Sequence, residues 1–181
     1  MEKLRTNFEI EVKWRAFPLH PETPEEGLTL EALFAGRNMD IPSAMARMKK
    51  VANELDLPWG ERKKTYNSRL AQELGKWAEA KGKGDQYHDA VFRAYFVDGK
   101  NIAKTDVLMG LVKGVRLPEN EASEALQTRA FRTSVDSDWA LVDEMGITSV
   151  PTFALDHRIL VGAEPYEALE QFLLGNGVKR R

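Results

Sequence analysis

The 181-residue sequence predicts an α/β fold in which a strand, a long helical middle and a C-terminal strand–strand–helix unit follow one another. Three observations predict it. Apolar and charged residues alternate strictly over residues 8–15, which is typical of a strand with one buried face. Helical periodicity, interrupted by caps and glycines, runs over about residues 40–128. Two short β-runs within residues 152–161 precede a helix that opens at Pro165.

The first predicted strand has an apolar face and a charged face. The apolar set is Phe8, Ile10, Val12 and Trp14, and the charged set is Glu9, Glu11, Lys13 and Arg15. Residues 22–27 are polar and proline-rich, which indicates a connection. We expect a short helix over residues 28–34.

The helical middle begins with two amphipathic segments. Ser43 is the expected cap of a helix that ends before Pro58, and Asn67 or Ser68 is the expected cap of the next. The first helix carries Met45, Met48, Val51 and Leu55, and the second carries Leu70, Leu74 and Trp77 at i, i+4 and i+7. Three further helices run from Asp85 to near Gly99, from Thr105 or Asp106 to Gly114, and, after Pro118, from Glu119 to Thr128.

The last third mixes helix and strand. One helix carries an apolar stripe and ends at Gly146, which suits the left-handed position after a helix. The members of the stripe are Val135, Trp139, Val142 and Met145. Residues 152–155 and 159–161 flank a turn at 156–158 and predict an antiparallel hairpin. The final helix then directs Tyr166, Leu169 and Leu173 inward.

The composition limits the kinds of partner that the protein is expected to bind and the cell compartment in which it is expected. The net charge of −2 argues against nucleic acid, and the basic residues 179–181 are too few to change this. No apolar run approaches the roughly 18 residues that a membrane span requires. The first seven residues lack the apolar core of a signal peptide, so we expect a cytoplasmic protein without a membrane partner.

The sequence contains no cysteine. Because the thiolate is the attacking species in disulfide exchange, the chain as given cannot carry out that reaction. We therefore expect no catalytic residue for disulfide chemistry, no thiolate metal ligand and no disulfide framework.

Other reactive residue types give only weak signals. His20, His88 and His157 have no metal-ligand spacing; we expect His88 on an exposed helix face and His157 in the hairpin turn. Ser68 and Ser149 lack the partners of a catalytic serine and are interpreted as a helix cap and a loop residue. The acidic residues 136, 138, 143 and 144 predict a solvated helix face. We expect no metal site and no resident cofactor.

Four motifs occur in order along most of the chain. They are Trp14-Arg15-Ala16-Phe17-Pro18-Leu19 with Pro21, Tyr66-Asn67-Ser68, Val91-Phe92-Arg93-Ala94-Tyr95-Phe96 with Asn101-Ile102, and Gly146 to Phe153. This ordered set resembles the DsbA-like branch of the thioredoxin fold, which includes FrnE-type proteins and 2-hydroxychromene-2-carboxylate isomerases. In the part that resembles the family, the sequence departs at Gln72, where the family usually has a histidine.

The resemblance implies one DsbA-like thioredoxin-fold domain over residues 1–181. Residues 7–20 and 129–176 would be the thioredoxin-type elements, and about 40–128 a helical insertion. The family's first strand, which carries Cys-Pro-x-Cys or a serine-containing equivalent, is not in the sequence. Residues 1–6 are similar to the tail of the helix that follows this motif.

The resemblance also implies where a ligand would bind. The Val150–Pro151 bond would be cis, and the backbone of Val150 would offer an edge to an extended peptide or to glutathione as a co-substrate. Ser149 belongs to the same loop, and Phe17, Leu19 and Pro21 would line the same cleft. The parent activity would be thiol-disulfide exchange. A degenerate binding or scaffold protein, or a glutathione-dependent isomerase lineage, are the alternatives; the substrate and the redox direction stay open.

The missing strand has a physical consequence. In the thioredoxin fold it lies between the second strand and the cis-proline strand, so its loss leaves two unpaired edges, which is costly. Three solutions exist: the native protein starts upstream of Met1, residues 7–15 pair differently, or a second chain fills the gap. We favour the first, and the unpaired edges also lead us to expect a homodimer.

Overall fold

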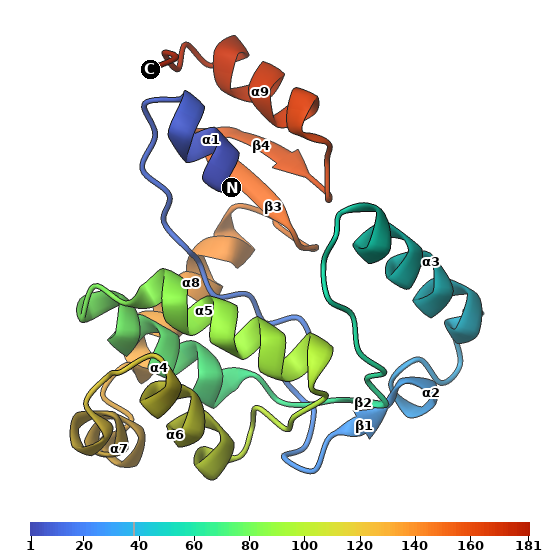
Figure 1. Cartoon of the computed structure of the whole chain (residues 1–181), viewed down its shortest axis with the longest axis vertical. Helices are drawn as coiled ribbons and strands as arrows, with labels where there is room; N and C mark the ends of the chain where they lie inside the picture. The colour runs from blue at the N-terminus through green and yellow to red at the C-terminus, as the bar shows by residue number, and fades with distance from the viewer. Residues whose placement is uncertain (38) are drawn as a thin grey trace. The chain divides into compact units, whose positions relative to one another are not determined.

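The computed structural model describes residues 1–37 and 39–181 and is rich in helices, with two short two-stranded sheets (Figure 1). In chain order the elements are α1 (Glu2–Asn7), β1 (Leu28–Thr29), α2 (Leu30–Leu33), α3 (Ile41–Glu54), β2 (Lys64–Thr65), α4 (Arg69–Ala80), α5 (Gly84–Phe92), the π-helix η1 (Arg93–Val97), α6 (Thr105–Gly114), α7 (Glu119–Thr128), α8 (Arg132–Glu144), β3 (Thr152–Leu155), β4 (Arg158–Val161) and α9 (Tyr166–Gly175).

The chain forms two compact units. One unit combines residues 1–19 with residues 136–181, and the other comprises residues 20–135. The division into thioredoxin-type elements and an insertion of about 40–128 stays a prediction.

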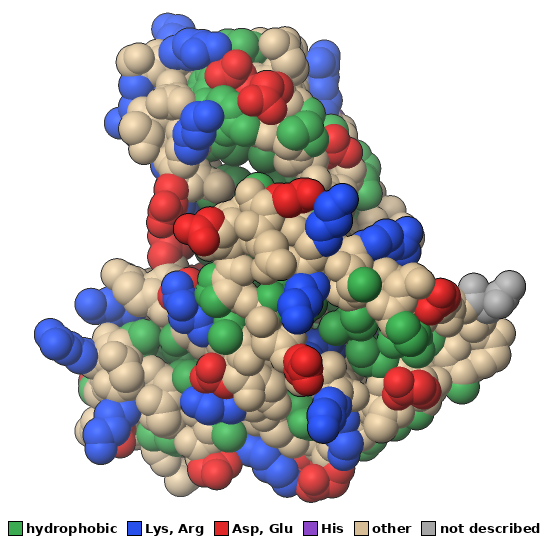
Figure 2. All heavy atoms as spheres, turned by 45° about the vertical axis from the view of Figure 1, so that its right-hand side comes forward, with side chains coloured by type: hydrophobic (Ala, Val, Ile, Leu, Met, Phe, Trp, Pro, Cys, Tyr) green, Lys and Arg blue, Asp and Glu red, His purple; other side chains and the backbone are tan. Residues whose placement is uncertain are grey.

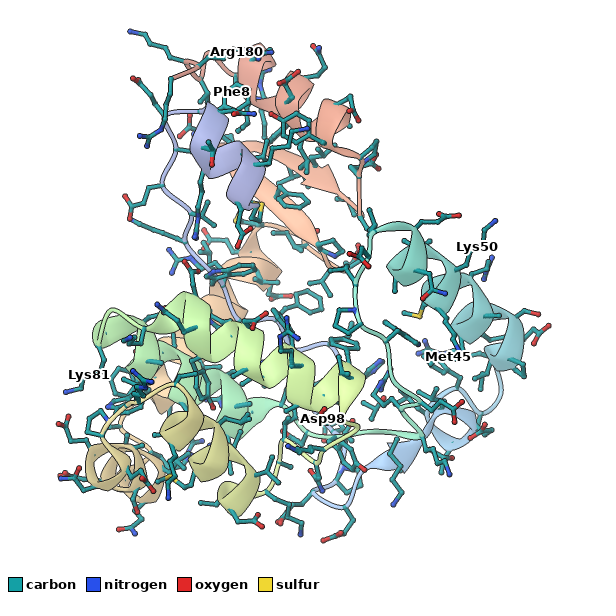
Figure 3. All side chains as sticks on the ribbon, viewed as in Figure 1. Phe8, Met45, Lys50, Lys81, Asp98 and Arg180 are labelled. Carbon is teal, nitrogen blue, oxygen red and sulfur yellow. The ribbon has the colours of Figure 1, made fainter. Side chains whose placement is uncertain are left out.

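The first unit has its core between α1, α9 and the β3–β4 hairpin. Leu4, Phe8 and Leu173 are buried there, and the half-buried Leu155 and Leu169 pack against them. The apolar positions predicted for the last helix therefore face inward, as expected. Figure 3 labels Phe8 and Arg180, which lie together: the Arg180 guanidinium carbon is 5.4 Å from the centre of the Phe8 ring.

The second unit has its core among α4, α5, α6 and α7. Its buried side chains include those of Leu74, Trp77, Tyr87, Leu108 and Val112. Leu74 and Trp77 lie on the face of α4 that the 3.6-residue periodicity predicts as apolar, so this assignment is confirmed.

Helix starts follow the local chemistry of their caps. The Asn67 side chain accepts the Arg69 N–H at 2.9 Å, which confirms the expected start of α4. The prediction that Ser43 caps α3 is wrong. Asp40 does so, because its carboxylate accepts the Ser43 N–H at 3.1 Å, while Ser43 lies in the first helical turn after Pro42.

The predicted strand over residues 8–15 is wrong. Only Phe8 forms a bridge, to Arg180, and residues 9–15 carry no assigned element. Trp14, expected to be buried, is 37% exposed. A strand needs a neighbour to satisfy its backbone groups, and among the described residues no strand pairs with this segment, so its alternating pattern has no ladder to join.

Two irregular features of the backbone were not predicted from the sequence. Leu28 and Thr29 pair antiparallel with Thr65 and Lys64, so the predicted helix over residues 28–34 is reduced to α2. The helix expected to continue to about Gly99 changes at Arg93 into the π-helix η1. Two-residue strands are too short to leave an alternating pattern. The π-helix η1 directly continues α5, as π-helical turns usually do within α-helices, so no break in the sequence marks the change.

Surface charge is mixed. On the face that Figure 2 draws, basic and acidic side chains are interspersed. Within the described part of the chain, no helix is long and apolar enough to cross a membrane.

Candidate ligand-binding loop around Pro151

The loop that carries Pro151 begins at the end of α8. Gly146 adopts a positive φ of 64°, which the sequence predicts for the residue after this helix. Its N–H donates to Asp143 at 2.9 Å, and the Ile147 N–H donates to Val142 at 3.0 Å. These two bonds close the helix C-terminus and fix the direction in which the loop leaves it.

Ser149, Val150 and Pro151 form an exposed turn before β3. The Val150–Pro151 peptide bond is cis, and Val150 is 47% exposed. The Thr152 hydroxyl donates to the Ser149 carbonyl at 2.7 Å, and the Gly162 N–H donates to the Pro151 carbonyl at 2.8 Å. The loop is therefore attached to β3 on one side and to the end of β4 on the other.

Strand β3 has one paired edge and one open edge. It pairs antiparallel with β4, with Ala154 opposite Ile159 and Leu155 opposite Arg158. Because the Gly162–Pro151 bond sets the alternation, the backbone groups of Phe153 and Leu155 point toward β4. Those of Thr152 and Ala154 point to the other edge, where no strand pairs with them among the described residues.

A buried carboxylate holds the segment before Phe17. One Asp138 oxygen accepts from Arg15 Nη1 at 2.9 Å, and the other accepts from the Ala16 N–H at 2.9 Å. Asp138 is only 2% exposed, so the prediction of a solvated acidic face is wrong at this residue. Its spacing from Val135 and Val142 places it on the buried stripe of α8, which is the signal that the sequence analysis missed.

The other predicted site residues lie as follows. Phe17 is half-buried and Leu19 is 54% exposed; both belong to the same unit as the Pro151 loop. Pro21 belongs to the second unit, where its carbonyl accepts from the Asn67 side chain at 3.0 Å. The shared cleft that the family resemblance implies for these residues stays a prediction.

The histidines and serines form no catalytic arrangement among the described residues. His157 lies in the hairpin turn, as predicted. His88 is not on an exposed face, because its Nε2 lies 3.1 Å from Glu79 and its ring packs where a side chain on Gly75 would be. Ser68 accepts from Gln72 at 3.1 Å rather than capping α4 with its hydroxyl. Within the described ranges, no three histidine or acidic residues are placed to hold a metal ion.

A second buried carboxylate also escaped the sequence analysis. Glu73, 3% exposed, accepts from Arg69 Nε and from Arg129 Nε, both at 2.6 Å. Burial alone would raise the pKa of Glu73, but the hydrogen bonds from Arg129 and Arg69 outweigh it and hold the pKa below its ordinary value. Its spacing from Leu70 and Trp77 places it on the buried face of α4.

In chemical terms the loop can bind rather than react. Without cysteine the chain offers no thiolate to attack a disulfide. The open edge of β3, in contrast, presents the outward N–H and C=O groups of two residues beside an exposed turn. Such an edge can accept an extended backbone by adding a strand.

Comparison with known proteins identifies the family. A model of the DSBA-like thioredoxin domain matches residues 1–174. The chain belongs to the DSBA-like thioredoxin domain family. The uncharacterized protein YwbO of Bacillus subtilis (strain 168) is 28% identical to this DSBA-like chain over 164 residues, which cover 90% of the chain and 80% of YwbO.

Solved structures resemble the DSBA-like chain over most of its length. A probable DsbA oxidoreductase from Streptomyces coelicolor is 25% identical, with a TM-score of 0.82 over 92% of this chain and 75% of its own. A 2-hydroxychromene-2-carboxylate isomerase is 17% identical, with a TM-score of 0.67 over 76% of this chain and 67% of its own. The cytosolic disulfide reductase DsbM from Pseudomonas aeruginosa, solved with GSH, is 23% identical, with a TM-score of 0.56 over 74% of each chain. The last two show the fold alone.

These findings confirm the DsbA-like thioredoxin fold and the family resemblance that the motifs predict.

Proposed function

We propose that this DSBA-like chain binds glutathione or an extended peptide along residues 149–151 and the open edge of β3, and that it carries out no disulfide exchange with its own residues. The protein would keep the backbone edge at which members of an oxidoreductase family bind their substrates, but it would lack the family's thiol chemistry. The cytoplasm is its expected location, in keeping with the cytosolic DsbM among proteins of the same fold.

One observation carries the proposal. The exposed turn at Val150 and Pro151 continues directly into β3, in which the backbone groups of Thr152 and Ala154 point away from β4. A bound backbone that pairs with these groups would replace water with a third strand, and three strands are more stable than an isolated hairpin. Glutathione is a tripeptide with two amide groups, and a longer peptide offers more.

The missing thiol decides the chemistry. Exchange requires a thiolate on one partner to attack a disulfide on the other, with a mixed disulfide as intermediate. A chain without cysteine forms no such intermediate. Glutathione bound here would therefore dissociate without chemical change. DsbM, which has the same fold, was solved with GSH, and this supports glutathione as the first ligand to test.

Calorimetric titration of the full chain with reduced glutathione tests the proposal, together with an insulin-reduction assay. We expect saturable binding and no insulin reduction above the protein-free blank. Ala154→Pro removes an outward N–H from β3 and should weaken binding about tenfold, as expected for losing one backbone hydrogen bond. Ile159→Pro changes the residue directly opposite on β4 and is the matched control.

Two outcomes would overturn the proposal. Insulin reduction by the purified chain would show thiol-independent redox chemistry. Failure of both glutathione and an unstructured peptide to bind at millimolar concentration would show that the edge is not a ligand site.

A further inference from the structure

The end of α9 contains the only Asn-Gly pair in the sequence, Asn176-Gly177. In such a pair the glycine nitrogen, once it has given its proton to hydroxide, can attack the side-chain carbonyl carbon of the asparagine, because glycine has no Cβ to obstruct the approach. The attack forms a five-membered succinimide and releases the amide nitrogen as ammonia. Water then opens the ring and leaves either aspartate or isoaspartate, in which the side-chain carbon has become part of the main chain.

The nitrogen that would attack is held in the turn that closes α9. Gly177 has a positive φ of 78° and donates its N–H to the Leu174 carbonyl at 3.0 Å. Val178 donates to the Leu173 carbonyl at 3.1 Å, which completes a Schellman motif. The Gly177 nitrogen therefore has to leave its hydrogen bond before it can react with Asn176.

The side chain of Asn176 is held as well. Its Nδ2 donates to the Phe172 carbonyl at 2.6 Å and so satisfies one of the carbonyl groups left over at a helix C-terminus. With a ψ of 12° at Asn176, the main chain turns the Gly177 nitrogen away from the side chain. Ring closure requires rotation about this bond and release of the amide, so the closed turn protects Asn176 from deamidation.

The same turn directs the end of the chain back to α1. Residues 178–181, the C-terminal strap, run beside the end of this helix. The Glu9 N–H donates to the Lys179 carbonyl at 3.0 Å, and Arg180 forms the bridge to Phe8 (Figure 3). The path of the strap therefore depends on the turn that precedes it.

The strap can detach while the rest of its unit stays folded. Chain termini open at a lower free energy than core elements do. Arg180 pairs with Glu170 at 3.1 Å, but the arginine side chain is 56% exposed, and exposed ion pairs contribute little to stability. Val178 is only half-buried where it packs on the core around Leu173. We therefore expect local opening of the strap and of the last turn of α9.

We propose that Asn176 is a deamidation site that reacts when the C-terminal strap detaches, and that its acidic products keep the strap detached. An aspartate cannot donate to the Phe172 carbonyl, and it places a negative charge at a helix C-terminus, where the helix dipole disfavours it. Isoaspartate also lengthens the main chain after α9, so the bonds of the Schellman motif no longer fit. The reaction is separate from ligand binding at the edge of β3, and neither proposal depends on the other.

Peptide mapping of the full chain, kept folded or in urea in a mildly alkaline buffer, tests the protection. Trypsin releases residues 159–179, in which Asn176 is the only asparagine, and the mass gain from amide to acid reports its reaction. We expect Asn176 to react before Asn67, which precedes a serine, in both states. The folded chain should react at Asn176 roughly tenfold or more slowly than the chain in urea, because hydrogen bonds have to open first.

Loosening the strap should speed the reaction of the folded chain. Arg180→Gln removes the ion pair with Glu170 and the contact with the Phe8 ring, and it should raise the rate severalfold. Lys179→Gln is the matched control, because it removes the neighbouring positive charge but keeps the carbonyl that accepts from Glu9. Its tryptic peptide ends at Arg180 instead, and its rate should equal that of the parent.

Asn176→Asp reproduces one product and tests the consequence for the strap. Hydrogen exchange of the Glu9 amide should be severalfold faster in this variant than in the parent, because the amide loses its acceptor when the strap detaches. Asn120→Asp makes the same change at an exposed position of α7 and should leave this exchange rate unchanged.

Three results would overturn the proposal. Equal rates at Asn176 in the folded chain and in urea would show that the turn gives no protection. Equal folded rates in Arg180→Gln and the parent would exclude the strap as the gate. Unchanged exchange of the Glu9 amide in Asn176→Asp would show that the product does not detach the strap.

Discussion

Asp138 and Arg15, 123 residues apart in the sequence, form an ion pair at 2.9 Å in which the aspartate is almost fully buried. Through this pair, α8 holds the segment that leads to Phe17 and Leu19. The C-terminal end of the same helix leads into the Pro151 loop. One helix thus anchors two of the segments that the sequence predicts as ligand-binding.

Replacing Asp138 by asparagine should destabilise the first unit. The amide keeps a hydrogen bond but loses the charge that compensates Arg15, and we expect a loss of about 1–3 kcal/mol in the free energy of unfolding. Urea denaturation followed by circular dichroism measures it. Asp143→Asn, an exposed change on the same helix, is the control, and equal stability of the two variants would contradict the structural role of Asp138.

Glu73 should make stability depend on pH in the acid range. Its folded pKa lies below the ordinary value of 4.5, so its contribution is fully present above pH 4.5 and is lost as the pH falls through the folded pKa. Glu73→Gln should flatten this part of the stability curve and cost about 1.5–3 kcal/mol at pH 7. Urea midpoints between pH 2 and pH 7, with the exposed Glu124→Gln as control, test this. An unchanged slope in Glu73→Gln would show that other groups cause the acid sensitivity.

Two glycines should respond in opposite directions to alanine. Gly60→Ala places a Cβ 1.8 Å from a backbone oxygen and should cost more than about 3 kcal/mol, because backbone has to move. Gly110 lies inside α6 with nothing within 4 Å of the new atom, so Gly110→Ala should stabilise by about 0.5–1 kcal/mol. Thermal unfolding compares the two. A mild effect at Gly60 would mean that Gly60 packs less closely on Val97 of η1 than the structure shows.

The expected homodimer remains a prediction. The open edge of β3 can pair with a second copy as well as with a peptide, and an unprotected edge is a known route to association. Sedimentation equilibrium should give a dimer mass for the parent chain and a shift toward monomer for Ala154→Pro. A monomer mass at high protein concentration would show that the open edge of β3 does not mediate self-association.

Much of the helical architecture could be predicted because helix periodicity and caps are local. Asn67, Gly146 and the apolar face of α4 are examples in which neighbours in sequence determine the outcome. Residues 9–15 show the limit: their alternating pattern is a strong local signal, but a strand forms only where a partner lies beside it. The Asp40 cap was missed because two capping residues compete within three positions.

The candidate sites were harder to predict than the helices because their geometry depends on contacts between residues far apart in the sequence. The spacing of Asp138 and Glu73 indicates burial, yet their partners come from distant parts of the chain, and only the folded structure reveals them. The Pro151 loop was predicted because its motif is contiguous.

The most direct measurement of the central claim is a nitrogen-15 NMR titration of the full chain with reduced glutathione. We predict saturable shifts of the Thr152 and Ala154 amides in the parent chain and in Ile159→Pro. In Ala154→Pro, which has no amide N–H at position 154, we predict that the Thr152 shift is lost. Saturable glutathione binding that leaves both amides unmoved, or no binding at all, would contradict it.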